Sequence, residues 1–166
     1  LEYTRTEEYI LNILNALEAF GDCNLIFTGP NADTYSHMIE HHVSQFIKTQ
    51  KHARFVKNFG QKDYFSLLAH ASLMIGNSSS GIIEAASFKL PVVNIGIRQA
   101  GRLRDLNVID TDTDTKSIRL GIQKALSEEF RLSLKDLKNF YGTGCASQKI
   151  VSELRKFIKR RNKYGN

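Results

Sequence analysis

The strongest constraint on the fold is the alternation of short apolar runs with longer amphipathic segments. Residues 24–29, 72–76 and 91–96 are apolar runs of strand length. Between and around them, apolar residues recur at three- and four-residue spacing, as on one face of a helix. Strands separated by helix-length segments predict βαβ units and a parallel sheet with helices on both faces. We therefore predict an α/β, doubly wound fold.

The expected elements follow these two periods along the whole chain. Helices are expected over residues 6–20, 33–48, 62–71, 81–88, 114–129 and 147–161, and strands over residues 24–29, 53–59, 72–76, 91–96 and 107–110. With 166 residues, 42% of them hydrophobic, residues 1–166 fit one domain of ordinary size.

The sequence also bears on location. No apolar run reaches the roughly 18 residues of a membrane span, and the first residues do not resemble a secretory signal. The prediction is therefore a soluble, cytoplasmic domain. The chain begins without Met and inside a helical pattern, which suggests a piece cut from a longer protein.

Cysteine and histidine spacing gives no metal or disulfide signature. Cys23 and Cys145 are far apart and fit no CxxC spacing, so two reduced thiols are expected. His37 and His41 are four residues apart and could share a helix face, but no HExxH motif accompanies them. We expect a solvated helix face at these histidines and at His42, and no bound metal.

The net positive charge arises at the end of the chain, and the other basic residues are balanced by acids. Residues 149–166 contain seven basic residues and one acid, which accounts for the whole net charge of +6. Apolar residues recur there at helical spacing and would form one stripe: Ile150, Val151, Leu154, Phe157 and Ile158. We expect a terminal helix packed through this stripe with its cations in water. A polyanion or membrane-surface contact is the alternative.

Two loops that follow predicted strands are the candidate site, because ligands of such folds bind beyond the carboxyl ends of the strands. They are TGPNAD (residues 28–33) and GNSSSG (residues 76–81). In the second loop, backbone N–H groups at a helix start and the hydroxyls of Ser78, Ser79 and Ser80 would suit a phosphate. N-capping is the alternative role for these serines.

Glycines and charged residues extend this candidate site. Gly76 and Gly81 permit close approach and unusual backbone angles. Glu84 does not fit a reciprocal capping box, and an unpaired buried carboxylate on a helix that packs against the sheet needs a partner, which the diol of a ribose would provide. After the next strand, Arg98 and Arg102 offer forked donors for phosphate oxygens or form an exposed basic loop.

The string IGNSSSGIIEAASFKLPVVNIGIRQAGR (residues 75–102) resembles the signature of the hydrolysing UDP-N-acetylglucosamine 2-epimerases. That family carries a GNSS-x-G-x-x-E segment followed by P-x-x-N-x-G-x-RQ-x-x-R. The loop at residues 28–33 resembles its Pro-Asn-x-Asp turn, and FVKNFGQKDYFSLLAHAS resembles the segment before the serine loop. The non-hydrolysing epimerases carry a different, Asp-Ser-Gly-Gly type of loop. The resemblance covers nearly the whole chain and implies the Rossmann-like carboxyl-terminal half of a glycosyltransferase-B-type, two-domain enzyme.

The resemblance also implies roles for individual residues. Ser78 and Ser79 would hold the diphosphate, Glu84 the ribose hydroxyls and Arg98 the phosphates or their surroundings. Two further contacts are implied, from Asn31 in the nucleotide pocket and from the backbone at Phe59 against the uracil. The acids that act on the sugar would come from the missing amino-terminal domain, so no catalytic residue is expected here and the fragment alone should be inactive.

The reaction implied for the parent enzyme is anti elimination of UDP followed by hydration, which converts UDP-N-acetylglucosamine to N-acetylmannosamine for sialic-acid-type sugars. It requires no metal or redox cofactor. The implied partners are UDP or a UDP-sugar and the missing domain, not nucleic acid or a membrane, and homo-oligomerisation of the parent is left open.

Three alternatives stay open. The substrate could be UDP-diacetylbacillosamine, or the domain could belong to a B-type glycosyltransferase. A non-enzymatic polyanion-binding module that uses the basic tail is the third.

Overall fold

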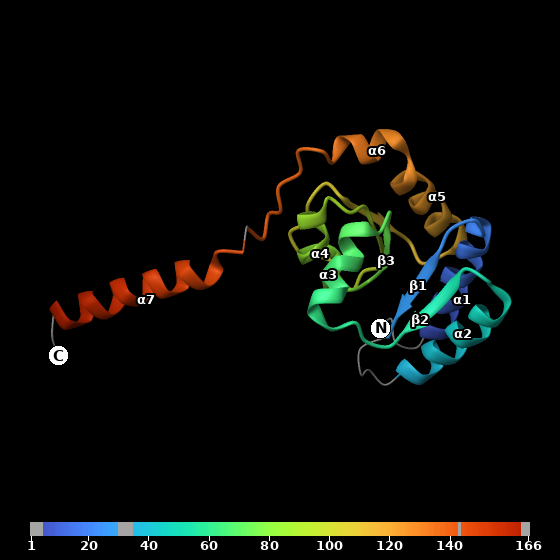
Figure 1. The fold of residues 1–166 in the computed structure, drawn as a ribbon, viewed down its shortest axis with the longest axis horizontal. Helices are drawn as coiled ribbons and strands as arrows, with labels where there is room; N and C mark the ends of the chain where they lie inside the picture. The colour runs from blue at the N-terminus through green and yellow to red at the C-terminus, as the bar shows by residue number, and fades with distance from the viewer. Residues whose placement is uncertain (1–4, 30–34, 143, 164–166) are drawn as a thin grey trace.

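The computed structural model describes residues 5–29, 35–142 and 144–163. In chain order the elements are α1 Thr6–Leu17, η2 Glu18–Phe20, β1 Leu25–Thr28, α2 Ser36–Thr49, β2 Ala53–Val56, α3 Gly60–His70, β3 Met74–Gly76, α4 Ser79–Ile83, η3 Ala85–Phe88, β4 Val92–Ile95, β5 Val108–Thr111, α5 Thr115–Leu126, α6 Glu128–Ser133 and α7 Ala146–Lys163 (Figure 1). Helices α4 and η3, and likewise β4 and β5, follow one another, and the other strands are separated by helices. This arrangement confirms the α/β class.

The strands pair in parallel in two groups. β1 pairs with β2 in the register Leu25 to Ala53, and β4 lies between β3 and β5 in the second sheet. The sequence predicted a parallel sheet, and the parallel pairing is confirmed. Within the described residues, however, no ladder joins β1 to β3, so the strands form two sheets.

Helices cover both faces of β4, as a doubly wound fold requires. Val93 and Ile95 belong to a core cluster that includes Ile118 and Ile122 of α5 and residues of α1 and α2. Val92, which alternates with them along the strand, packs in a second cluster with Leu68 of α3. All four residues of β4 are buried, so the strand reads as one continuous apolar run apart from Asn94.

Two expected helices are broken in the structure. The segment expected as one helix over residues 81–88 consists of α4 and the 3-10 helix η3, which meet at Glu84. The helix expected over residues 114–129 ends at Leu126, because Ser127 leaves helical geometry and its side chain caps α6. The expected strand at residues 53–59 is also shorter, since Phe59 already caps α3.

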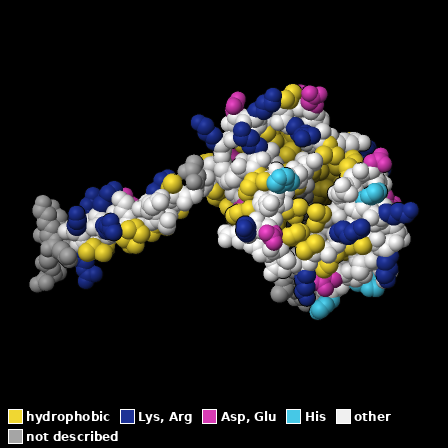
Figure 2. All heavy atoms as spheres, viewed as in Figure 1, with side chains coloured by type: hydrophobic (Ala, Val, Ile, Leu, Met, Phe, Trp, Pro, Cys, Tyr) yellow, Lys and Arg dark blue, Asp and Glu magenta, His cyan; other side chains and the backbone are white. Residues whose placement is uncertain are grey.

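The terminal helix differs most from the expectation. α7 projects away from the body (Figure 1), and its apolar stripe is exposed, with Phe157 at 64%. Figure 2 shows apolar side chains gathered along one side of α7 and cations along the other. The expected packing of this stripe is wrong for the described part of the chain.

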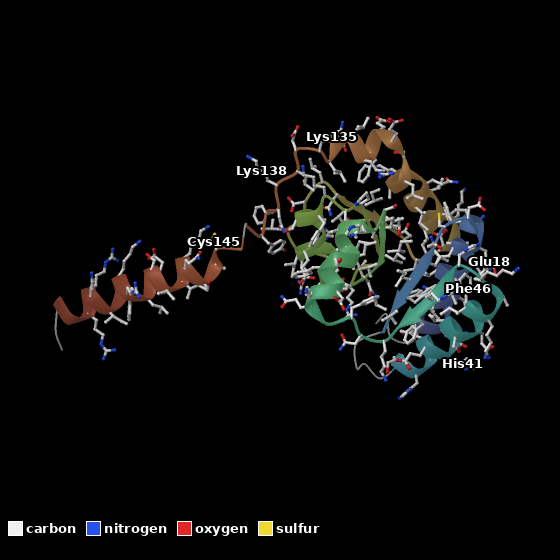
Figure 3. All side chains as sticks on the ribbon, viewed as in Figure 1. Glu18, His41, Phe46, Lys135, Lys138 and Cys145 are labelled. Carbon is white, nitrogen blue, oxygen red and sulfur yellow. The ribbon has the colours of Figure 1, made fainter. Side chains whose placement is uncertain are left out.

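The connection that leads to α7 is attached to the body. It carries Lys135, Lys138 and, next to α7, Cys145 (Figure 3). The Asn139 side chain donates to the carbonyl of Ile83 at 2.8 Å. This contact holds the start of the connection against the end of α4.

The histidine segment lies on α2. His37 and His41 are exposed, as expected for a solvated helix face, and Figure 3 shows His41 on the outer side of α2. His42 is half-buried, and its Nε2 lies 3.1 Å from a carboxylate oxygen of Glu7. Among the described residues, no helix is both long and apolar enough to cross a membrane.

Candidate functional site

The serine turn joins the end of β3 to α4, at the carboxyl end of the sheet. Gly76 adopts φ +140°, a conformation that favours glycine. Ser78 then caps α4, because its Oγ accepts from the backbone N–H of Ser80 at 3.3 Å and its carbonyl accepts from that of Gly81 at 3.2 Å. The capping role of Ser78 is therefore confirmed.

This capping changes what the turn can offer an anion. Two N–H groups of the first turn, those of Ser80 and Gly81, already donate to Ser78. The helix has only five residues, so its dipole is small. Ser78 and Ser79 are exposed, and a hydroxyl that accepts a hydrogen bond still has its own proton to donate. The hydroxyls are thus better placed than the dipole to hold a phosphate.

Glu84 lies at the junction of α4 and η3 and has a partner within the chain. The Ser80 hydroxyl donates to Oε2 of Glu84 at 2.5 Å. Glu84 is half-buried, and its Oε1 accepts no hydrogen bond from the described residues. The carboxylate is therefore held at one oxygen and can accept from a ligand at the other.

Tyr64 of α3 joins the same cluster and was missed by the sequence reasoning. Its hydroxyl lies 2.7 Å from Oγ of Ser80. Burial raises the pKa of Tyr64, and the negative charge of Glu84 raises it further, against the effect of the hydrogen bond with Ser80. The phenol is protonated at neutral pH, as it is at its ordinary pKa of about 10.

The loop after β4 is held against the serine turn by Gln99. This side chain is 4% exposed, and its Nε2 donates to the carbonyl of Asn77 at 2.8 Å. Arg104 donates to the Gln99 carbonyl at 2.9 Å and also pairs with Asp110. Gln99 belongs to the RQ pair seen in the sequence, but its tie to Asn77 was not foreseen.

The remaining residues expected in the site lie outside the serine turn, on other segments of the chain. Arg98 is exposed on the same loop as Gln99, and Arg102 is exposed further along it. Phe59 is half-buried and precedes α3, the helix that carries Tyr64. Asn31 lies outside the described residues. Ser78 and Ser79 thus lie at the start of α4 and Glu84 at its end, and a hydrogen bond from Gln99 ties the Arg98 loop to the serine turn.

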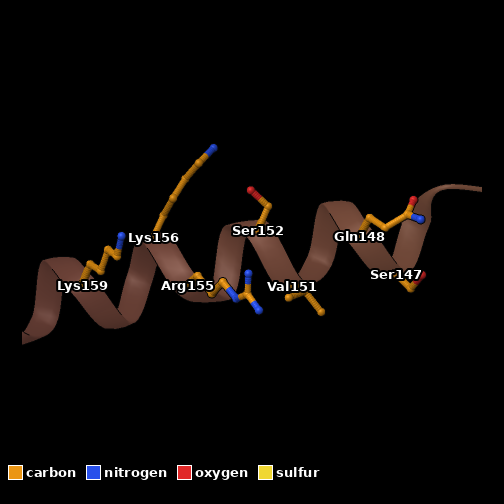
Figure 4. A pocket seen from close by; sticks show the side chains of 7 residues that line it. All are labelled: Ser147, Gln148, Val151, Ser152, Arg155, Lys156 and Lys159. Carbon is orange, nitrogen blue, oxygen red and sulfur yellow. The ribbon is translucent and has the colours of Figure 1, made fainter.

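Neither of two surface hollows coincides with this turn. One, of about 520 Å³, is open space along a single exposed helix, because the seven side chains beside it all belong to α7: Ser147, Gln148, Val151, Ser152, Arg155, Lys156 and Lys159 (Figure 4). The other, of about 470 Å³, lies between β1 and β3 and is lined mainly by apolar residues such as Ile26 and Leu73. Figure 2 shows apolar side chains gathered in the middle of the body.

Comparison with known proteins gives a consistent result. The family described as UDP-N-acetylglucosamine 2-epimerase matches residues 2–155. The polysialic acid biosynthesis protein P7 of Escherichia coli is 36% identical over 157 residues, which are 94% of this chain and 40% of that protein. A hydrolysing GDP/UDP-N,N'-diacetylbacillosamine 2-epimerase of Campylobacter jejuni is 38% identical over 132 residues, which are 79% of this chain and 34% of that protein.

The fold is also similar to a solved structure. The structure of S. aureus MnaA with UDP superposes with a TM-score of 0.74 at 14% identity, over 92% of this chain and 42% of that one. At this identity the likeness concerns the fold alone. The chain spans 34–42% of the length of these three proteins.

Proposed function

Because the chain belongs to the UDP-N-acetylglucosamine 2-epimerase family, we propose that it is the UDP-sugar-binding domain of a hydrolysing epimerase. The parent enzyme would convert UDP-N-acetylglucosamine and water to N-acetylmannosamine and UDP. The observation that carries the proposal is the short helix α4, which has two exposed hydroxyls at its start and a carboxylate held at one oxygen at its end. As a biosynthetic enzyme, the parent would act in the cytoplasm.

The turn would hold the two polar parts of UDP. Ser78 and Ser79 would donate to the diphosphate, with Arg98 on the neighbouring loop adding positive charge. Glu84 would accept from the ribose hydroxyls through the oxygen that Ser80 does not occupy. The uracil would lie against the backbone at Phe59, with Asn31 lining the same pocket.

The chain would assist the reaction by binding the leaving group. In the elimination step, the proton on C2 of the sugar is removed and the bond from C1 to the UDP oxygen breaks, which gives a 2-acetamidoglucal and UDP. Addition of water across the double bond then gives the product with C2 inverted. Donors at the diphosphate stabilise the negative charge that develops on UDP. The groups that move the protons would lie in a domain outside this chain.

Two nucleotide sugars are candidates for the substrate of the parent enzyme. The relative from C. jejuni is described as acting on N,N'-diacetylbacillosamine nucleotides, and that from E. coli as serving polysialic acid biosynthesis. We favour UDP-N-acetylglucosamine because it is the substrate in the family's description. The matching relatives do not favour the alternative of a B-type glycosyltransferase.

Calorimetric titration with UDP tests the proposal. The wild-type chain should bind UDP saturably, and Glu84→Ala should weaken binding by roughly 10- to 100-fold, since hydrogen bonds to a charged group are lost. Glu153→Ala is the control, because it removes an exposed acid of α7 that pairs with Lys156. If the cations of α7 bound UDP, this control would bind more tightly and Glu84→Ala would bind as well as wild type, which would contradict the proposal.

A further inference from the structure

Three polar side chains from two helices and their junction form one chain of hydrogen bonds at the proposed ribose site. Tyr64 comes from α3, Ser80 from α4, and Glu84 from the residue between α4 and η3. The hydroxyl of Tyr64 lies 2.7 Å from Oγ of Ser80, and Ser80 donates to Glu84. Ser80 is thus the bridge between a phenol and a carboxylate.

The protons in this chain can be assigned from the chemistry of the three groups. A serine hydroxyl has a single proton, and an ionised carboxylate has none to give. Ser80 therefore donates its proton to Glu84, and the proton between Tyr64 and Ser80 must come from Tyr64. Hydrogen bonds that run in one direction polarise one another, so the phenol strengthens the bond that Ser80 makes to Glu84.

The consequence is a carboxylate fixed before a ligand arrives. Oε2 of Glu84 is occupied by Ser80, which leaves Oε1 to accept from a ligand hydroxyl. Fixing a side chain in its binding conformation lowers the entropic cost of binding. Tyr64 is half-buried, and a phenol with its ordinary pKa of about 10 is protonated at neutral pH, so the donor is in place.

We propose that Tyr64 is a positioning residue for nucleotide recognition, which acts through Ser80 to orient Glu84 toward the ribose diol. The proposal rests on the proposed function and adds to it a residue outside the serine loop, in the segment that precedes this loop along the chain. Tyr64 also lies between the proposed ribose contact at Glu84 and the proposed uracil contact at Phe59, because it is one turn into α3, the helix that begins beside Phe59. Selectivity for a ribose that keeps its diol would depend on this phenol.

The experiment compares UDP with 2′,3′-dideoxy-UDP, which lacks the diol, on the wild-type chain and on Tyr64→Phe. The substitution removes one oxygen and keeps the ring that packs near Phe65. We expect the Kd for UDP to rise about three- to ten-fold, the effect of one hydrogen bond, and the Kd for the dideoxy nucleotide to stay the same. Tyr9→Phe, on α1, is the control and should leave both constants unchanged.

A second variant separates positioning from general damage to the fold. Ser80→Ala removes the bridge, so adding Tyr64→Phe to it should cause no further loss of UDP affinity. Three outcomes would each overturn this inference and leave the proposed function standing. They are an equal loss of affinity for both nucleotides in Tyr64→Phe, additive losses of UDP affinity in the double variant, and an unchanged UDP affinity in Tyr64→Phe. A wild-type chain that does not bind UDP would overturn the proposed function and this inference together.

Discussion

Glycine occurs on both sides of the serine turn, for two different physical reasons. Gly76 adopts a positive φ, whereas Gly81 lies so close to β4 that an added Cβ would come within 2.9 Å of Cγ1 of Val92. The unusual angle predicted for these glycines is confirmed at Gly76, whereas the packing of Gly81 against a strand was not predicted from the sequence.

Gly81→Ala should therefore destabilise the domain. Alanine is favoured over glycine inside a helix by roughly 0.5–1 kcal/mol, but overpacking a core costs about 1–3 kcal/mol. The net expectation is a loss of about 1 kcal/mol, measured by urea unfolding. Gly21→Ala is the control, since nothing lies within 4 Å of its added Cβ and the expected change is zero or a small gain. Equal stability of Gly81→Ala and wild type would contradict the close packing.

Some residues of the site could be predicted from the sequence and others could not. Ser78, Ser79 and Glu84 lie within seven residues of the chain, so one motif predicts that they lie near one another. Tyr64 and Gln99 reach the turn from positions 16 and 22 residues away from their partners. These contacts depend on how α3 and the loop after β4 pack against the serine turn. A local sequence motif does not predict this packing.

Helix boundaries in this protein depend on caps as much as on periodicity. The apolar period runs through Ser127, yet its hydroxyl accepts from the N–H of Phe130 and starts a new helix. At the start of α5, Asp114 accepts from the N–H groups of Lys116 and Ser117. Hydrogen bonds from the side chain and the backbone of Ser117 hold the pKa of Asp114 below its usual value of 3.8.

This cap predicts a pH-dependent contribution to stability. Since the pKa of Asp114 is lowered by folding, its contribution is complete above about pH 3.8 and is lost as the pH falls through the folded-state value. Asp114→Ala should lower the melting temperature at pH 7, and the difference from wild type should shrink toward pH 3. Ser127→Ala removes an uncharged cap, so its effect should stay constant over the same range. A difference for Asp114→Ala that does not change with pH would contradict the charged cap.

At the scale of the whole molecule, the sequence predicted the parallel α/β class but neither the division of the strands into two sheets nor the exposed α7. A buried strand appears in the sequence as a short apolar run, whether the next strand pairs with it or lies across a cleft from it. The apolar runs therefore do not predict where one sheet ends and the other begins. Likewise, the stripe of α7 shows that one face is apolar but not what covers it. Within the described chain that face stays uncovered.

The most direct test of the central claim is a crystal structure of this chain with UDP. The account predicts diphosphate oxygens within hydrogen-bonding distance of Ser78 and Ser79, and ribose hydroxyls on the Oε1 oxygen of Glu84. UDP bound in the cleft between β1 and β3, or along the cations of α7, would contradict the assignment of the serine turn as the nucleotide site.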